Sequence, residues 1–430
     1  MVNQHVVEQH AEEAGFLWTM RHQAVHAPHY DLTDIAELDE AVEAHLDGLR
    51  VAGQAGWDAV MALAPEAPES IFPLSVLAFG GGDRECMRDA FIMGGADTET
   101  LSALISALGW LDDAAPVLTE LMGAQIPIYR RAGIAASAIR RQDPGPLLAK
   151  LIDDPDAQVR ARALRAAGEL KRRDLAAQVA AHFNDPDEAC RFWAIWTLCI
   201  FGYPKAVDAL SPYLSKADSP FNLHALHMGL RCAPPAQQAD LFNALCRAPG
   251  LERQAVMGAG IVGNLALMPW LIEQMQQPAL AKYAGESFSM MTGIDIYYDD
   301  LDLKEEESGD EEDEDDEDDI PESADSTESD EEMPDSDDDE QMPDPAEEDD
   351  LPVPDPRLIA AWWKERQRQY TIGQRYLAGE IISPGTAMNV LRRGLQRQRK
   401  AAAIELALLQ REQPLFEVRA RGKKQKRMLP

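Results

Sequence analysis

The sequence predicts an all-α protein, an α-solenoid of short helix pairs followed by a disordered acidic linker and a small helical C-terminal module. Three observations lead to this prediction. An amphipathic helix recurs at intervals of 29 to 34 residues, a second amphipathic segment follows it in most repeats, and the charges gather in separate zones. With 430 residues and 45% hydrophobic content the chain can bury a large core, but its uneven charge argues against a single globule.

The clearest single helix is predicted between Leu151 and Leu170. Asp154 can cap its start, Pro155 fits the first helical position, and Asp156 lies favourably at the positive end of the helix dipole. Its apolar face is a stripe at helical spacing, formed by Val159, Ala163, Ala166 and Leu170. The other side is charged and carries Arg160, Arg165, Glu169 and Lys171. One face of this helix therefore needs a partner.

The same pattern returns 31 residues later, with Asp185, Pro186 and Arg191 at the equivalent positions. Small or helix-ending residues mark a wider rhythm at Gly109, Ala138, Gly168, Gly202, Cys232 and Gly263. After several of these residues the sequence contains a short loop and then a second amphipathic segment. Each repeat is therefore predicted to be a pair of helices. A pair this short cannot bury its own apolar face, and neighbouring pairs must stack.

The repeat lacks the signatures of tetratricopeptide and ankyrin units. Asp-Pro-Asp followed by Val-Arg and Ala-Ala-Gly resembles short HEAT-like repeats instead, although standard HEAT units run to about 40 to 47 residues. We therefore assign residues 1–298 to a HEAT-like α-solenoid, with the clearest repeats in 100–280.

A disordered acidic linker is expected over residues 299–352. Its central stretch, residues 305–350, holds 29 Asp and Glu and no Lys or Arg, so it has little to bury and its carboxylates repel one another. The simplest role is a solubilising spacer. Two alternatives are an electrostatic mask that folds back on the basic tail and a decoy for a basic partner.

Residues 353–430 are expected to form a basic helical C-terminal module or a cap of the solenoid, built from three helices around a Gly-rich turn. Trp362 and Trp363 cannot both face inward on one helix unless that helix is sandwiched. Either one of them anchors a partner, or both pack between the module and the solenoid. They are candidate partner-binding residues together with Arg392, Arg393 and Arg397.

The basic residues of this module also raise nucleic-acid binding as an alternative, because they could contact phosphates and have aromatic neighbours. They are Arg392, Arg393, Arg397, Arg399, Lys400, Lys423, Lys424, Lys426 and Arg427. The neighbouring carboxylates would compete with a nucleic acid, so a protein partner is favoured.

Gly258, Gly260 and Gly263 spell the dinucleotide-binding pattern G-x-G-x-x-G. The pattern needs a strand leading into it within a β-α-β unit, and no such strand is evident. Gly263 lies in phase with the repeat. Close packing between stacked helices is therefore the better interpretation, and no cofactor is expected.

Histidines crowd the first 45 residues, and His22, His26 and His29 form a conceivable zinc trio. Their spacing matches no strong metal signature, and His29 follows Pro28 in an expected turn. His224 and His227, on a later helix, are interpreted as packed or surface residues. No metal site is predicted.

The chain contains no nucleophile elbow, phosphate-binding loop or H-E-x-x-H motif, so no enzymatic activity is expected. Its five cysteines show no C-x-x-C spacing, which favours a reducing compartment. The N-terminus lacks the basic start and apolar core of a signal peptide, and no membrane span is evident. A cytoplasmic location is therefore expected.

Four stretches together resemble an uncharacterised bacterial HEAT-like repeat family that is commonly encoded beside type VI secretion genes. They are AEEAGFLWTMR from Ala11, HLDGLRVAGQAGW from His45, AGESFSMMTGIDI from Ala284 and AWWKERQRQYTIGQRYLAGE from Ala361. The acidic stretch departs from the resemblance. The resemblance implies a cytoplasmic accessory role in handling a secreted effector or spike component. Together with the repeats and the absent catalytic motifs, it favours a non-enzymatic protein-binding scaffold, adaptor or chaperone, or an immunity-like partner. It brings no catalytic residues.

Overall fold

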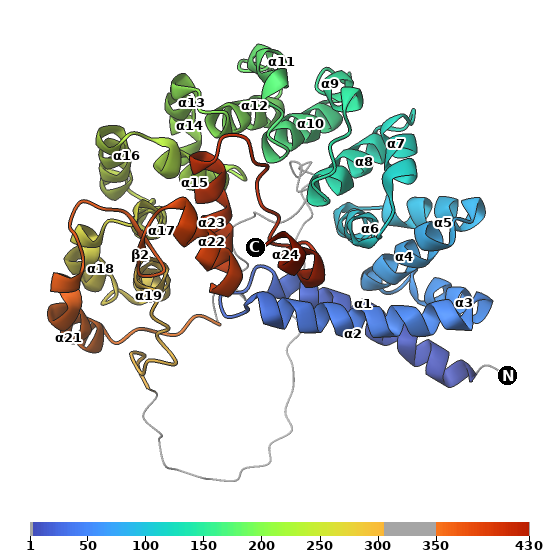
Figure 1. The fold of residues 1–430 in the computed structure, drawn as a ribbon, viewed down its shortest axis with the longest axis horizontal. Coiled ribbons are helices and arrows are strands. Elements are labelled where there is room, and N and C mark those ends of the chain that lie inside the picture. Colours follow the sequence, from blue (N-terminus) through green and yellow to red (C-terminus); the bar gives the residue numbers. More distant parts are fainter. Residues whose placement is uncertain (1–2, 305–349, 430) are drawn as a thin grey trace, which may run out of the picture.

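The computed structural model describes residues 3–304 and 350–429, and the predicted α-solenoid is confirmed there. Its helices stack side by side in an arc that runs from the N-terminal helices to α19 (Pro278–Thr292; Figure 1). Residues 384–428 of the C-terminal segment lie inside this arc, whereas residues 356–366 lie at its end (Figure 1). The expected disorder of residues 305–349 lies outside the described residues.

The arc consists of an N-terminal group and a series of helix pairs, each with an inner and an outer helix. The N-terminal group is α1 (Gln4–Ala24), α2 (Leu32–Ala52) and α3 (Gln54–Leu63), followed by η1 (Pro68–Ser70). The inner helices, which stack on one another, are α4 (Ile71–Gly81), α6 (Thr98–Trp110), α8 (Pro127–Ile139), α10 (Ala157–Glu169), α12 (Glu188–Ile200), α15 (Asn222–Cys232), α17 (Glu252–Val262) and α19 (Pro278–Thr292). The outer elements are α5 (Arg84–Gly94), α7 (Ala115–Met122), α9 (Pro146–Leu151), η2 (Arg173–Leu175), α11 (Ala176–Ala181), α13 (Pro204–Ala209), α14 (Ser211–Leu214), α16 (Pro235–Arg247), η3 (Leu265–Leu267) and α18 (Met268–Gln274).

The start of α10 corrects the predicted helix in one respect. The helix begins at Ala157, and its N-cap is Asp156, whose carboxylate accepts a hydrogen bond from the backbone N–H of Val159 at 3.1 Å. Asp154 lies outside the helix and accepts instead from the N–H of Asp156 at 3.0 Å. Asp154 therefore stabilises the turn before the helix, and Asp156 caps the helix.

The aspartates at the turns also join neighbouring repeats. Arg130 donates two hydrogen bonds to Asp154 at 2.8 and 2.9 Å, and Arg160 reaches Asp185 of the next repeat at 3.4 Å. Each bridge runs from an inner helix to the turn before the following one. Repetition of the Asp-Pro-Asp turn therefore repeats an ion pair as well as a helix start.

The small residues that mark the rhythm lie where inner helices approach closely. A Cβ atom added at Gly168 would lie 2.5 Å from the hydroxyl oxygen of Thr197 on the next inner helix. One added at Gly109 would lie 3.1 Å from Ile139. The regular spacing of these small residues therefore results from the close stacking of α6 on α8 and of α10 on α12.

The C-terminal segment contains more elements than the three helices expected around a Gly-rich turn. It comprises α21 (Pro356–Arg366), η4 (Gln367–Gln369), β1 (Tyr376–Leu377), β2 (Glu380–Ile381), α22 (Pro384–Arg393), α23 (Gln396–Leu409) and α24 (Gly422–Met428). The expected turn is an antiparallel hairpin in which Tyr376 pairs with Ile381. Ala378 and Gly379 connect its strands with positive φ angles of 49° and 83°, which suits a two-residue hairpin loop.

This segment starts beside the outer helix α18 at one end of the arc and then crosses the inside of the arc to α2 at the other end. Helix α21 packs on α18, the hairpin contacts α19, α23 packs against α15, and α24 packs against α2. Part of the segment shares the main hydrophobic core, to which it contributes Ile359, Trp362, Trp363, Tyr376 and Ile404. Helices α22 and α23 add a small core of their own.

The flanks of the acidic stretch are ordered, so the residues between them form a shorter segment than the predicted linker of 299–352. Leu301 and Leu351 are buried. Asp302 forms a β-bridge with Pro354, and the N–H of Leu303 donates to the carbonyl of Val353 at 2.8 Å. The two flanks therefore lie side by side beyond α19.

Candidate functional site: the concave face of the solenoid

The inner helices carry a cationic or aromatic residue at an equivalent position of each repeat. This pattern is not visible when each helix is considered alone. The positions 131, 162, 193, 224, 253 and 282 follow one another at intervals of 31 or 29 residues, one on each inner helix from α8 to α19. They are Arg131, Arg162, Trp193, His224, Arg253 and Lys282, and we call them the inner row. Because the repeats stack in register, equivalent positions line the same face.

Side chains of the inner row contact one another or their neighbours on adjacent helices. The guanidinium of Arg165 lies 4.5 Å from the ring centroid of Trp193, whose ring in turn meets His224 edge to face at 4.8 Å. Further along, the guanidinium of Arg253 lies 4.2 Å from the ring of Tyr283. Cation–π and aromatic contacts therefore bridge successive repeats on the concave side.

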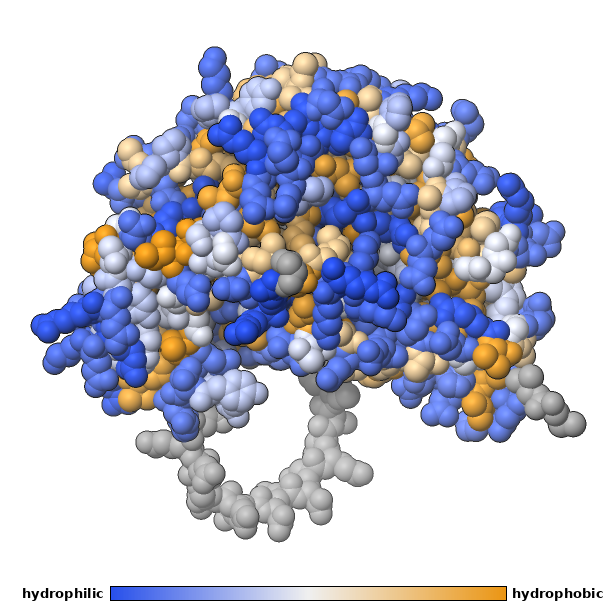
Figure 2. Space-filling view, in the orientation of Figure 1, coloured by the Kyte–Doolittle hydropathy of each residue, from blue (hydrophilic) through white to orange (hydrophobic). Residues whose placement is uncertain are grey.

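The C-terminal segment forms the wall opposite the inner helices. Lys171 donates to the carbonyl of Ala407 at 2.6 Å, and the Nε of Arg231 lies 3.3 Å from Glu405 of α23. The N–H of Leu415 donates to the carbonyl of Glu169 at 2.9 Å. Side chains fill the inside of the arc, and the surface seen in this view is mostly hydrophilic (Figure 2).

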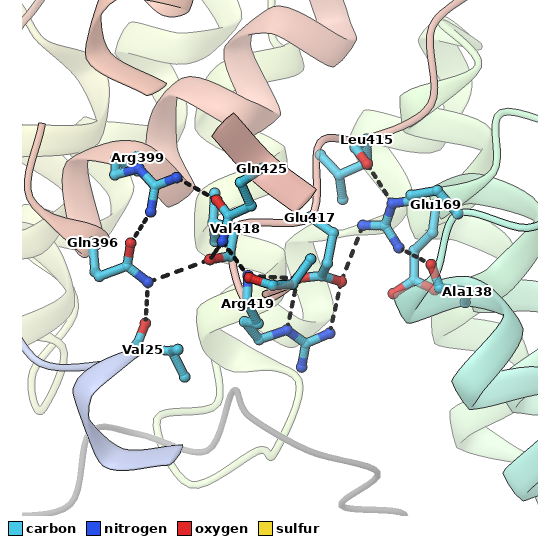
Figure 3. A network of polar contacts seen from close by, with 12 residues as sticks. Val25, Ala138, Glu169, Gln396, Arg399, Leu415, Glu417, Val418, Arg419 and Gln425 are labelled. Atoms are coloured by element: carbon cyan, nitrogen blue, oxygen red, sulfur yellow. Dashed lines mark hydrogen bonds and ion pairs between the residues drawn. The ribbon is translucent and has the colours of Figure 1, made fainter. Parts of the chain in front are cut away.

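A polar network holds the centre of this wall (Figure 3). Arg419 donates to the two carboxylate oxygens of Glu417 at 2.9 and 3.1 Å. The guanidinium of Arg141 lies 3.3 Å from the same carboxylate and also donates to the carbonyl of Leu415. This network ties the segment to α8.

A second part of the network ties the segment to the N-terminal helices (Figure 3). Arg399 is fully buried and donates to the side-chain oxygens of Gln396 and Gln425. Gln425 donates to the carbonyl of Val418 at 2.7 Å, while Gln396 donates to that of Val25 at 3.3 Å. The amides thereby satisfy the buried guanidinium and backbone groups together.

Glu169 is the most strongly compensated carboxylate of the concave face. Its two carboxylate oxygens form ion pairs with the guanidinium groups of Arg162 and Arg165, each at an N–O distance of 3.0 Å. Burial alone would raise the pKa of Glu169, but these guanidinium groups, with those of Arg141 and Arg419, outweigh burial and hold the pKa well below its ordinary range. The carboxylate is therefore ionised inside the protein.

A cavity of about 60 Å³ lies between the inner helices, the C-terminal segment and the end of α1. Its charged and titratable lining includes Arg165, Glu169, His224, His227, Lys400 and Arg419. A second cavity of about 40 Å³ is lined by Trp18, Arg21, His22, Trp110, Arg419 and Arg421. Cavities of this size hold a few waters or a small anionic group such as a carboxylate.

The candidate residues on α21 are used by the fold. Trp362 and Trp363 are only 9% and 8% exposed. The ring of Trp362 meets Phe288 of α19 edge to face at 5.2 Å, and that of Trp363 stacks on Tyr370 at 5.8 Å. Because both indoles are sandwiched inside the chain, neither offers a face to a partner in this structure.

The three candidate arginines do not form one patch. Arg397 donates to the carbonyl of His26 at 2.9 Å and to Glu286 at 2.8 Å, so it joins α1 to α19. Arg392 and Arg393 end α22 and are exposed. A partner-binding role stays a prediction for these two residues.

The basic residues considered for nucleic-acid binding are likewise divided. Arg399 lies inside the wall, and Lys424 donates to the carbonyl of Arg140 at 2.9 Å. Lys423, Lys426 and Arg427 are exposed on α24. The sequence stretch is therefore not a single cationic surface.

The glycine pattern belongs to packing, as interpreted from the repeat. A Cβ atom on Gly260 would lie 3.0 Å from Ser287 of α19. Gly263 ends α17 with a φ of 69°, and its carbonyl accepts from the N–H of Tyr376 at 2.8 Å. The pattern lies in helix α17 and at its end, and among the described residues no strand leads into it.

The suggested zinc trio does not assemble. The ring centroids of His22 and His26 lie 6.0 Å apart, and His29 packs against Tyr30 instead. Within residues 3–304 and 350–429, no group of three His, Cys, Asp or Glu side chains could hold a metal ion.

The charged side of α10 is buried, whereas its helical pattern indicated a side exposed to solvent. Arg165, Glu169 and Lys171 are 9%, 3% and 7% exposed, because the C-terminal segment covers them. Arg165 and Glu169 line the cavity beside this segment, and Lys171 bonds directly to the carbonyl of Ala407. Burial lowers the pKa of Lys171 to about 8. The signal that could have revealed this face is the recurrence of Arg162, Trp193 and His224 at one repeat position.

Comparison with known proteins supports the repeat class. Residues 145–231, from α9 to α15, match the family described as HEAT repeats. A search of curated proteins found no match. The fold and this match show an α-solenoid with HEAT-like repeats. None of the helices in the described part of the chain is both long and apolar enough to cross a membrane.

Proposed function

We propose that this protein is a non-enzymatic scaffold of the adaptor or chaperone kind and that its solenoid receives a protein partner. The observation that carries the proposal is the stack of helix pairs itself, which matches HEAT repeats over residues 145–231. Solenoids of this class bind extended segments along their concave surfaces.

The setting we propose is type VI secretion, with the protein handling an effector or a spike component or acting as an immunity-like partner. This part rests on the resemblance of the sequence to a HEAT-like family encoded beside such genes. A cytoplasmic location accords with five free cysteines, of which Cys190 and Cys199 are buried.

The test is affinity purification of the tagged full-length protein from its own cells at moderate salt, with bound proteins and nucleic acids both identified. We expect a stoichiometric protein partner. Its recovery should fall with Arg253→Gln and Lys282→Gln together, because both side chains belong to the inner row and are only partly buried.

The matched control is Lys205→Gln with Lys216→Gln, which removes two exposed cations from the outer helices and their turns. Recovery of no protein would refute the scaffold function. Nucleic acid alone, lost on removal of residues 392–427, would support a nucleic-acid-associated factor instead.

A further inference from the structure

The second cavity, of about 40 Å³, lies between α1, α6 and the loop that leads into α24. Helix α1 contributes Trp18 and Arg21, helix α6 contributes Ser106 and Trp110, and Arg421 precedes α24. Ser106 and Arg421 are only partly buried, so the cavity opens to solvent on their side. A small solute can therefore reach it.

Two side chains of α1 line this cavity with N–H groups that lack an acceptor. Trp18 and Arg21 are only 6% and 8% exposed. Arg21 donates through Nε to Asp39 at 2.9 Å and through Nη2 to the carbonyl of Arg419 at 2.5 Å, whereas its Nη1 makes no hydrogen bond within residues 3–304 and 350–429. The indole N–H of Trp18 has no acceptor in that part of the chain either. Because buried N–H groups are almost always bonded, these two indicate an acceptor inside the cavity.

The rest of the lining is rich in donors and poor in acceptors. The hydroxyl of Ser106 has no hydrogen-bond partner among the described residues, and the guanidinium of Arg421 lies 4.7 Å from the ring of Trp110. Of the described residues, no Asp or Glu lines the cavity. An ionised carboxylate only accepts hydrogen bonds, and a guanidinium can hold both of its oxygens. A carboxylate therefore complements this lining.

The guanidinium groups are held in place from outside the cavity. Asp39 accepts from the Nε of Arg21. Glu43 accepts from the Nη2 of Arg421 at 2.9 Å and from the indole N–H of Trp110 at 2.6 Å. Neither carboxylate lines the cavity. Their bonds fix the orientation of the guanidinium groups, while the Nη1 of Arg21 remains for a ligand.

The volume of the cavity limits the ligand. One water needs about 10 to 15 Å³ of such space, so about 40 Å³ accommodates a carboxylate group but not a nucleotide or a sugar. Waters alone satisfy the lining less well, because each water must also donate hydrogen bonds and the lining offers few acceptors. The rings of Trp18 and Trp110 and the side chain of Ile139 form an apolar border that suits the short alkyl group of a carboxylic acid.

We propose that this cavity binds a carboxylate group, with the indole N–H of Trp18, the guanidinium groups of Arg21 and Arg421 and the hydroxyl of Ser106 as donors. The carboxylate belongs either to a small free carboxylic acid or to the C-terminus of a peptide, since both present the same two oxygens. The inference goes beyond the proposed function, because a scaffold can bind its partner elsewhere on the solenoid whether or not this site is used.

The experiment observes the eight tryptophan indole N–H groups of the full-length protein by ¹H–¹⁵N NMR after selective labelling. The probe is sodium acetate, which replaces sodium chloride at constant ionic strength and neutral pH. We expect one indole signal, absent from Trp18→Phe, to move downfield and to saturate, because its N–H gains an acceptor. The signals of Trp362 and Trp363, which are buried on α21, should stay in place.

A second titration identifies the source of the carboxylate. The probes are N-acetyl-trialanine with a free C-terminus and the same peptide as its C-terminal amide. Movement of the Trp18 signal with the acid form of the peptide assigns the site to a chain terminus. Movement with acetate but with neither peptide assigns it to a small free acid. Both results support the carboxylate site, whereas an equal response to the amide would overturn it.

Substitutions locate the site. Ser106→Ala should raise the dissociation constant for acetate about threefold to tenfold, through the loss of one hydrogen bond. Ser102→Ala is the matched control, because Ser102 lies one turn away on the same helix and does not line the cavity. Arg421→Gln should raise the dissociation constant about tenfold or more, since it removes a charged donor. Lys423→Gln, which removes an exposed cation from the same segment, should leave it unchanged.

Three results would overturn the proposal. A Trp18 signal that stays in place with acetate and with the acid peptide would show that the cavity holds only water. A shift that grows linearly without saturation would mark an adventitious ion only. Equal effects of Ser106→Ala and Ser102→Ala would place the acetate elsewhere. Recovery of a protein partner from cells does not depend on these outcomes, so the scaffold function has its own test.

Discussion

At position 169 a carboxylate lies inside the protein between two guanidinium groups. Arg162 and Arg165 reach it from the same helix, and its backbone carbonyl accepts from Leu415 of the C-terminal segment. Removing one partner of such a buried group leaves the remaining charges uncompensated, which costs about 3 to 5 kcal/mol. Glu169 therefore contributes to the fold although a helical pattern alone places it towards solvent.

Replacing Glu169 with Gln should lower the free energy of unfolding by about 3 kcal/mol, because two buried guanidinium groups lose their counter-charge. Chemical denaturation measures the loss. The control is Glu66→Gln, at an exposed position, which should change stability by less than about 0.5 kcal/mol. Similar effects of the two substitutions would contradict the assigned role.

The same substitution has a defined pH dependence. The pKa of Glu169 is lower in the folded state than the unfolded value of about 4.3, so the unfolded chain binds more protons at low pH. The stability contributed by this group is complete above the unfolded pKa and is lost as pH falls below it. The difference between wild type and Glu169→Gln should shrink when denaturation is repeated below about pH 4.

The protonation of Lys171 affects stability at alkaline pH rather than at acid pH. Its folded pKa is about 8 because of burial, whereas an unfolded lysine has a pKa of about 10.4. Between these values the unfolded chain binds more protons, so this group makes the folded state more stable as pH rises. The wild type should therefore gain stability relative to Lys171→Met between pH 8 and 10 in denaturation experiments, and parallel curves would refute this.

At the scale of elements, the hairpin β1–β2 shows why glycines end α17 and α19. Gly263 and Gly293 close these helices with φ angles of 69° and 74°. Their neighbourhood also receives the hairpin, since Tyr376 donates to the carbonyl of Gly263 and Ala378 to that of Met290, both at 2.8 Å. The ends of two inner helices therefore form the docking site of a segment more than 80 residues away in sequence.

Gly263→Ala should release this hairpin. A Cβ atom there would lie 2.5 Å from the carbonyl oxygen of Tyr376, in addition to the cost of a positive φ. Gly202→Ala is the matched control, because Gly202 has a φ of 83° but no atom within 4 Å of the added Cβ. We expect about 1 kcal/mol for the control and more than twice that for Gly263→Ala by denaturation. Hydrogen exchange of the Tyr376 amide should rise only in the latter.

The elements of the solenoid could be predicted from the sequence because their signals are local. Spacing of apolar residues, the Asp-Pro-Asp turn and the small residues at Gly109 and Gly168 all act within one or two helices. The cap was displaced from Asp154 to Asp156 because both aspartates are capable of capping and only the turn geometry selects between them. The concave face could not be predicted in this way, since its charged residues are buried by a segment distant in sequence.

At the scale of the whole molecule, the C-terminal segment joins the two ends of the arc. Arg397 connects α1 to α19 through His26 and Glu286, and the N–H of Gly422 donates to the carboxylate of Asp39 on α2. These partners are separated by up to 383 residues. Their pairing depends on the curvature of the complete stack, which no local pattern specifies. From the sequence alone, the C-terminal residues were therefore predicted to form a separate basic module or a cap.

A chain that ends at Ala420 should therefore have a looser N-terminal end. The truncation removes α24 and Arg421, which contacts Glu43 of α2 at 2.9 Å and lies over the ring of Trp110 at 4.7 Å. It also removes Gln425, a partner of the buried Arg399. Hydrogen exchange should accelerate in α1 and α2 but not in α17 and α19, and small-angle scattering should give a larger radius of gyration.

The control for this truncation is Lys423→Gln with Lys426→Gln in the full-length chain, which neutralises two exposed cations and leaves α24 in place. It should exchange like the wild type. If the truncated chain loosened uniformly along the arc, the segment would act as a general stabiliser of the core. If exchange changed nowhere, the arc would hold its shape through helix stacking alone. A change confined to α1 and α2 is expected because α24 and Arg421 join the segment to this end of the arc, whereas the hairpin that holds α17 and α19 remains.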